Sequence, residues 1–203
     1  VGFNYPTRGT QDGWTYTLIW PLMLGDYARW HDNTTWLKAR LPGLRHTMSG
    51  MAAFENADGL LDKLSGWSFM DWVPEWRYGV APDGYGCNCI NNLFYAYALR
   101  DAALVESVVG EPELAAMYTR KAELVGRKIV SLFWDKSRGL LADTVIGSRA
   151  KQEYSEHCQC LAILLDILPE AKAARAAKGL VHVADLARCT VYFSHYLFET
   201  YAK

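Results

Sequence analysis

Residues 85–134 read YGCNCINNLFYAYALRDAALVESVVGEPELAAMYTRKAELVGRKIVSLFW, and this stretch decides the fold. Its first half, up to Val109, is apolar on most sides of a helix, whereas the half after Gly110 is apolar on one side only. Helices that are apolar all round are buried, and amphipathic helices cover them. The stretch therefore predicts a hairpin made of one buried helix and one covering helix.

The same pairing extends along the chain in both directions. Apolar spacings of three and four residues predict buried and covering helices in alternation, over 14–30, 34–54, 85–108, 111–134, 156–168, 170–180 and 185–202. The first three buried helices are predicted to start at Trp14, Tyr85 and Glu156, at equal intervals of 71 residues. The best candidate for a short strand is 181–183.

A repeated helix pair is the sequence signature of a toroid or a solenoid of hairpins. The long connection over 56–82 favours an α/α toroid. We expect an all-α protein in which residues 1–203 form a single domain, a segment of a six-hairpin toroid. Three and a half hairpins are present, so the toroid is predicted to be an incomplete (α/α)6 barrel.

Composition narrows the class of function. The 203 residues are 51% hydrophobic, and 21 basic against 22 acidic residues leave a net charge of -1. This balance argues against a nucleic-acid partner, and no apolar run reaches the roughly 18 residues of a membrane span. The chain holds 8 Trp, 12 Tyr and 7 Phe, which indicates a large core or a stacking surface.

The five cysteines lie in apolar stretches. Their odd number and the absence of a signal-peptide pattern slightly favour the cytoplasm. Two Cys-x-Cys pairs, Cys87/Cys89 and Cys158/Cys160, invite a zinc hypothesis, but positions two apart on a helix point about 200° apart. We therefore expect buried thiols and no metal. No phosphate-binding loop, nucleophile elbow or zincin motif occurs, and we predict no cofactor.

Parallel buried helices bring their N-termini to one rim, where unpaired N–H groups suit polar ligands. The segment 66–76, GWSFMDWVPEW, leads to this rim and combines three tryptophans with two carboxylates. Indole faces stack on sugar rings, and carboxylates accept hydrogen bonds from hydroxyls. The alternative is structural: Trp67, Phe69 and Trp72 plug the barrel end while Asp71 caps a turn.

Glu156 and His157 stand together at the start of a predicted buried helix. They are candidates for a general acid–base pair or for contacts with a bound substrate. The alternative is a helix cap in which the glutamate interacts with the helix dipole.

Five parts of the chain carry a family resemblance: Tyr5-Pro6-Thr7 with Trp14–Trp20, Leu41–Arg45, Asp58–Val73, Phe133–Thr144 and Ser155–Leu164. In this order they resemble the catalytic domain of bacterial α-L-rhamnosidases of glycoside hydrolase family 78. The most specific of them is Asp58–Val73, which is similar to the family's "dG-L … W-x-F-x-D-W" stretch.

The resemblance implies a six-hairpin (α/α) barrel that removes terminal α-L-rhamnose from glycosides with inversion. Inverting hydrolysis needs a general acid and a general base about 6.5–9.5 Å apart. The resemblance places the acid before Tyr5 and the base after the last buried helix. We therefore expect the catalytic residues to lie outside this chain, which we interpret as the middle part of a longer polypeptide.

The resemblance also implies a carbohydrate substrate. It suggests that Asp71 hydrogen-bonds sugar hydroxyls while Trp72 and Trp14 stack on the ring, with Trp67 in the same stretch. Glu156 stands where relatives often have Gln, which argues against a catalytic role. Two alternatives remain open: another six-hairpin glycosidase or lyase, and a non-catalytic toroid that binds sugar or protein. Uncovered helix faces predict self-association.

Overall fold

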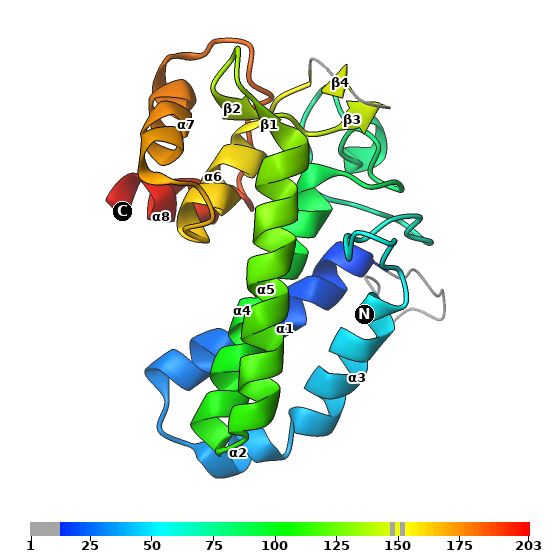
Figure 1. Cartoon of the computed structure of the whole chain (residues 1–203), viewed down its shortest axis with the longest axis vertical. Helices are drawn as coiled ribbons and strands as arrows, with labels where there is room; N and C mark the ends of the chain where they lie inside the picture. Colours follow the sequence, from blue (N-terminus) through cyan, green and yellow to red (C-terminus); the bar gives the residue numbers. More distant parts are fainter. Residues whose placement is uncertain (1–12, 147–148, 151–152) are drawn as a thin grey trace.

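The computed structural model describes residues 13–146, 149–150 and 153–203, and this part is mainly helical (Figure 1). The segment Tyr5-Pro6-Thr7 lies outside the described residues. The described helices, in chain order, are α1 (Trp14–Trp30), α2 (Thr34–Lys38), α3 (Leu41–Ala52), the 3-10 turn η1 (Arg77–Gly79), α4 (Cys89–Val109), α5 (Pro112–Phe133), α6 (Glu156–Leu164), α7 (Glu170–His182) and α8 (Ser194–Ala202).

Short strands, which the sequence did not predict, lie between α5 and α6. The described ones form two antiparallel pairs, β1 (Trp134–Asp135) with β2 (Leu140–Leu141) and β3 (Val145–Ile146) with β4 (Arg149–Ala150). Each strand is two residues long. They turn the chain between helices and leave the fold class all-α.

The predicted central hairpin is confirmed as α4 and α5. Asn88 caps α4 by accepting the Asn91 N–H on Oδ1 at 2.8 Å. Gly110 ends α4 with a left-handed φ of 90°, and Pro112 occupies the first turn of α5. Most of α4 is buried, whereas α5 buries one face. Apolar composition thus decides which helix lies inside.

The other helices are arranged around α4. Helix α1 packs against one side of α4 and α6 against another, while α7 and α8 both pack against α6 (Figure 1). Helices α2 and α3 follow α1 on the outside, as α5 follows α4. The described chain is therefore three hairpins followed by the first helix of the next, which is part of an α/α toroid.

Several predicted boundaries are wrong for local reasons. The helix expected over 34–54 is split into α2 and α3, because Pro42 has no N–H to continue the ladder. The helix expected to start at Tyr85 begins at Cys89, after the Asn88 cap. Residues 181 and 182 end α7 and form no strand, and α6 stops at Leu164.

The largest correction concerns 185–202, where the helix begins only at Ser194. The preceding residues run across the start of α6, and their backbone N–H groups bond to that region. Ala187 donates to the Tyr154 carbonyl at 2.9 Å, for example. If these residues formed a helix, their N–H groups would bond to carbonyls within that helix and would lose the partners they have here.

The equal 71-residue interval is also wrong, since Tyr85 does not begin a helix. The true correspondence is between α4 and α6, which both carry a side-chain amide four residues after the N-cap. Asn92 in α4 bonds both main-chain groups of Leu61, at 2.7 and 3.2 Å. Gln159 in α6 bonds both main-chain groups of Leu141, at 2.9 and 2.8 Å. Helices α4 and α6 thereby each hold the loop that covers the start of the helix.

Candidate functional site

Residues 66–76, the rim loop, lie across the first turns of three buried helices. Thr15 Oγ1 in α1 donates to a rim-loop carbonyl at 2.5 Å. Asn91 Nδ2 in α4 donates to a rim-loop serine hydroxyl at 3.4 Å. His157 Nε2 in α6 lies 2.9 Å from Asp71 Oδ2. The starts of α1, α4 and α6 therefore meet at one rim, as predicted.

Asp71 is fully buried in this rim. Its Oδ2 also accepts the Thr190 backbone N–H at 2.7 Å, and its Oδ1 accepts the Trp72 N–H at 2.9 Å and the Thr190 hydroxyl. Burial alone would raise the pKa of Asp71, but hydrogen bonds from His157 and Thr190 outweigh it and lower the pKa. Asp71 is thus an ionised, fully engaged carboxylate. Direct sugar binding by Asp71 stays a prediction.

His157 is enclosed on all sides. Its ring lies 4.1 Å from the Phe193 ring and 4.7 Å from the Trp76 ring, and its side chain has no exposed surface. Nε2 donates to the ionised Asp71, and Nδ1 is buried with no hydrogen-bond partner in the described part of the chain. This arrangement makes His157 a support for Asp71.

Glu156, the neighbour of His157, bonds to a different segment. Its buried carboxylate accepts from Arg188 Nη1 at 2.6 Å and from the Cys189 backbone N–H at 2.8 Å. Residues 187–190, which we call the strap, thus bind Glu156 through Arg188 and Cys189. The next residue of the strap, Thr190, binds Asp71. One extended segment holds two buried carboxylates at the start of α6.

The tryptophans of the rim differ in accessibility. Trp72 is 63% exposed, with its ring 4.9 Å from that of Phe69. Trp67 is partly buried, and its Nε1 donates to the Tyr78 carbonyl at 3.1 Å. Trp14 is also partly buried and packs edge-on against Phe54 at 4.6 Å. Of the three predicted stacking residues, Trp72 offers the most open face.

The strap is the part of the site that sequence reasoning missed. Thr190 lies 119 residues from Asp71 and falls inside the range predicted to be helical. Because 185–202 was predicted to be a helix, the backbone N–H groups of the strap were expected to bond within that helix and not to Asp71 or Glu156. The apolar residues around Arg188, Cys189 and Thr190 depart from helical spacing, and this departure could have indicated that the segment is not helical.

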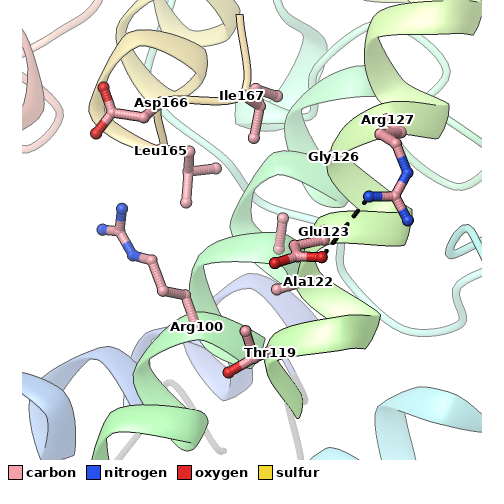
Figure 2. A pocket seen from close by; sticks show the side chains of 10 residues that line it. Arg100, Thr119, Ala122, Glu123, Gly126, Arg127, Leu165, Asp166 and Ile167 are labelled. Carbon is pink, nitrogen blue, oxygen red and sulfur yellow. Dashed lines mark ion pairs between the residues drawn. The ribbon is translucent and has the colours of Figure 1, made fainter. Parts of the chain in front are cut away.

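A separate cavity lies away from the rim, at mid-length of α4 and α5. The cavity has a volume of about 340 Å³. Figure 2 shows the side chains that line it, including those of the turn after α6. Its charged lining residues are Arg100, Glu123, Arg127 and Asp166, and Glu123 pairs with Arg127 at 3.7 Å. No aromatic side chain lines it. A sugar ring would have no flat aromatic face to stack on in this cavity, which favours the rim as the candidate site for a sugar.

The structure also bears on metal and membrane chemistry. Among the described residues, no group of three or more His, Cys, Asp or Glu side chains is placed to hold a metal ion. All five cysteines are free thiols, and Cys89, Cys158 and Cys160 are buried, where burial raises their pKa. No helix in the described ranges is long and apolar enough to cross a bilayer.

Comparison with known proteins agrees with this geometry. Residues 4–191 match a protein-family model described as the bacterial alpha-L-rhamnosidase six-hairpin glycosidase domain. A GH78-family rhamnosidase of Bacillus sp. GL1 has a similar structure, with a TM-score of 0.84, 23% identity and 97% of this chain covered. A rhamnosidase from Klebsiella oxytoca with rhamnose bound gives a TM-score of 0.78, 17% identity and 98% coverage.

The chain spans 20% of the length of the Bacillus chain and 37% of the length of the Klebsiella chain. At these identities the two structures establish the shared fold. A comparison with curated protein sequences gives no match.

Proposed function

Because this chain belongs to the bacterial α-L-rhamnosidase six-hairpin glycosidase family, we propose that it serves the hydrolysis of terminal α-L-rhamnosides with inversion. The described rim contributes part of the sugar-binding wall. The observation that carries this proposal is the exposed Trp72 beside the buried Asp71, where the starts of three buried helices meet.

The contacts of Trp72 support different roles for Trp72 and for Asp71. An exposed indole presents a flat apolar face, on which the C–H face of a sugar ring can stack. The Trp72 N–H donates to Asp71 Oδ1, so the carboxylate fixes the main chain that carries the indole. Helix N-termini behind the rim supply partial positive charge toward ligand oxygens. In this proposal Asp71 acts as a positioning residue and Trp72 as the sugar contact.

The catalytic acid and base are not assigned to Asp71 or Glu156. A general acid must give its proton to the leaving oxygen, and a general base must reach a water molecule. Both carboxylates are buried, and both are hydrogen-bonded to the strap. We propose that the acid and the base come from residues outside this chain.

A second candidate function is sugar binding without catalysis. The engagement of Asp71 and Glu156 favours it, because neither carboxylate is available for proton transfer in this arrangement. Both candidates predict rhamnoside binding at the rim. They differ in whether bond cleavage follows.

The test is hydrolysis of an aryl α-L-rhamnoside by the chain, beside aryl glycosides of other sugars, with binding measured in parallel. Turnover of the rhamnoside alone supports the hydrolase and contradicts the proposal that the acid and base lie outside the chain. Rhamnoside binding without turnover fits both candidates, and an assay of a longer protein that contains this chain then decides between them. Turnover of a different sugar contradicts both.

We also propose that the chain self-associates through apolar side chains left exposed. Met23, Trp30 and Phe198 are 59%, 83% and 66% exposed on helices that would lie inside a complete barrel. Exposed apolar surface of this kind promotes association. Light scattering is expected to give a mass above that of one chain. A monodisperse monomer would contradict this proposal.

A further inference from the structure

We propose that the cavity between α4, α5 and the turn after α6 binds a small organic anion, a carboxylate with an aliphatic body. This space of about 340 Å³, which we call the Arg100 cavity, is lined by residues of both helices and by Leu165, Asp166 and Ile167 (Figure 2). It lies away from the rim. The proposal therefore concerns a ligand other than the sugar and stands apart from the proposed function.

The lining of the Arg100 cavity consists largely of small and aliphatic groups. Ala96 belongs to α4, Ala122 to α5, and Leu165 and Ile167 to the turn. Thr119 also lines the space, but its hydroxyl already donates to a carbonyl one turn earlier in α5, at 2.9 Å. These surroundings suit the hydrocarbon part of a ligand.

The wall that the turn forms is fixed by packing. A Cβ at Gly126 would lie 2.8 Å from Ile167 Cγ2, so the turn packs directly on α5 at a position without a side chain. The Leu165 N–H donates to the Leu161 carbonyl at 2.9 Å, which ties the turn to α6. The space beside this contact is thus formed before a ligand enters, which lowers the entropic cost of binding.

Arg100 brings hydrogen-bond donors to the cavity that the protein leaves unused. Its Nη1 donates to the Leu164 carbonyl at 3.0 Å, and its guanidinium lies 4.4 Å from the centre of the Tyr97 ring. Its Nε is buried and has no hydrogen-bond partner in the part of the chain that the structure describes. A buried N–H without an acceptor costs free energy, and a ligand oxygen would remove that cost.

Asp101 engages Arg100 only weakly. Its Oδ1 lies 3.9 Å from Arg100 Nε, which is beyond hydrogen-bond distance. Arg29 bonds both Asp101 oxygens, at 2.5 and 3.3 Å. Because Arg29 is the main partner of this buried carboxylate, Arg100 can accept a second anion.

The two acidic residues that line the cavity have cationic partners of their own. Glu123 pairs with Arg127 at 3.7 Å, as the dashed line in Figure 2 shows. Asp166 pairs with Lys203 at 2.5 Å. Each negative charge at the cavity is therefore balanced, and the Arg100 guanidinium is left to receive the ligand.

The combination of these features selects an aliphatic carboxylate. A guanidinium forms charge-assisted hydrogen bonds with a carboxylate, and its planar fork matches the two carboxylate oxygens. An inorganic anion would leave the aliphatic lining unfilled. An aromatic body would have no ring to stack on, because no aromatic side chain lines the space.

The experiment titrates the chain with sodium octanoate by isothermal titration calorimetry, beside sodium acetate and octylamine hydrochloride. Acetate keeps the charge and lacks the body, whereas octylammonium keeps the body and carries the opposite charge. Octanoate is expected to bind at least about tenfold more tightly than either. Equal binding of acetate would mean an adventitious anion contact, and equal binding of octylammonium would mean an apolar surface without a charged site. Either result would overturn the proposal.

Two variants place the ligand in the Arg100 cavity. Arg100→Gln removes the charge and is expected to weaken octanoate binding by about tenfold. Ala122→Leu fills the space and is expected to abolish binding. The matched controls are Arg120→Gln and Ala116→Leu, at exposed positions of α5 that do not line the cavity, and both are expected to bind octanoate as the wild type does.

Absence of octanoate binding to the wild type, or binding that Arg100→Gln and Ala122→Leu leave unchanged, would overturn the proposal. Circular dichroism checks that each variant is folded. If one of the two fails to fold, the other decides, and if both fail, the comparison of the three ligands on the wild type decides.

Discussion

His157 Nε2 lies 2.9 Å from Asp71 Oδ2, although 86 residues separate the two in the sequence and both side chains are fully buried. Asp71 belongs to the rim loop and His157 to the first turn of α6. A buried carboxylate is tolerated only when donors satisfy it. This contact therefore ties the rim loop to α6 and sets the position of Trp72.

Asp71→Asn is expected to lower the free energy of unfolding by about 3 kcal/mol, because an amide N–H₂ would face donors in a buried site. It is also expected to weaken sugar binding by about 1–3 kcal/mol. Urea denaturation and calorimetry check the two effects. The control is Asp58→Asn, at an exposed ion pair with Lys128. Unchanged stability would remove Asp71 from its supporting role, and unchanged affinity would remove it from the site.

Acid sensitivity is expected at Asp135. Hydrogen bonds, first from the Ser137 hydroxyl and then from the Tyr154 hydroxyl, lower the pKa of Asp135 to about 2. The unfolded carboxyl titrates near about 3.9, so the folded chain gains stability above that pH and loses it as pH falls toward about 2. Asp135→Asn should flatten the stability curve in this window. Parallel curves for variant and wild type, from urea denaturation at each pH, would disprove the assignment.

Asn92→Ala is expected to cost about 3 kcal/mol, because it leaves the buried N–H and carbonyl of Leu61 without partners. Asn33→Ala is the control. Asn33 caps the exposed start of α2 by accepting the Trp36 N–H at 2.9 Å, and its loss should cost about 1 kcal/mol. Chemical denaturation of both variants measures the difference. Equal costs would mean that the clamp on Leu61 adds nothing beyond an ordinary cap.

Two ion pairs are expected to contribute very different amounts to the free energy of unfolding. Arg45 bonds both oxygens of Glu106, at 2.9 and 2.8 Å, and Glu106 has no exposed surface. Arg45→Met leaves that charge buried alone and is expected to cost about 3–5 kcal/mol. Lys128→Met breaks an exposed pair with Asp58 and should cost less than about 1 kcal/mol. Thermal or urea unfolding of the two variants tests this ranking.

Sequence periodicity was sufficient to predict the helices whose burial depends on how apolar they are. The α4–α5 hairpin is confirmed, since an apolar run ends at Gly110 and an amphipathic run follows Pro112. Periodicity failed where individual hydrogen bonds override it. Pro42 divides a predicted helix, and the residues before Ser194 give their N–H groups to α6 and the rim loop.

The site was predictable only in part. The aromatic content of the rim loop and the meeting of helix starts follow from local pattern, and the structure brings both together. The pairing of Asp71 with His157 and Thr190 depends on contacts across 86 and 119 residues, for which no local signal exists. The exposure of each tryptophan could not be predicted either. Trp67 and Trp72 lie in the same loop, but Trp67 is partly buried and Trp72 is exposed.

The most direct test of the central claim is a calorimetric titration of the chain with L-rhamnose, beside D-mannose, D-glucose and L-fucose, repeated for Trp72→Ala and Tyr201→Ala. Tyr201 is an aromatic residue on α8 that is 53% exposed, and it serves as the control. We predict that L-rhamnose binds more tightly than the other sugars and that only Trp72→Ala weakens it, by about tenfold. Equal binding of all four sugars, or rhamnose binding that survives Trp72→Ala unchanged, would contradict the account.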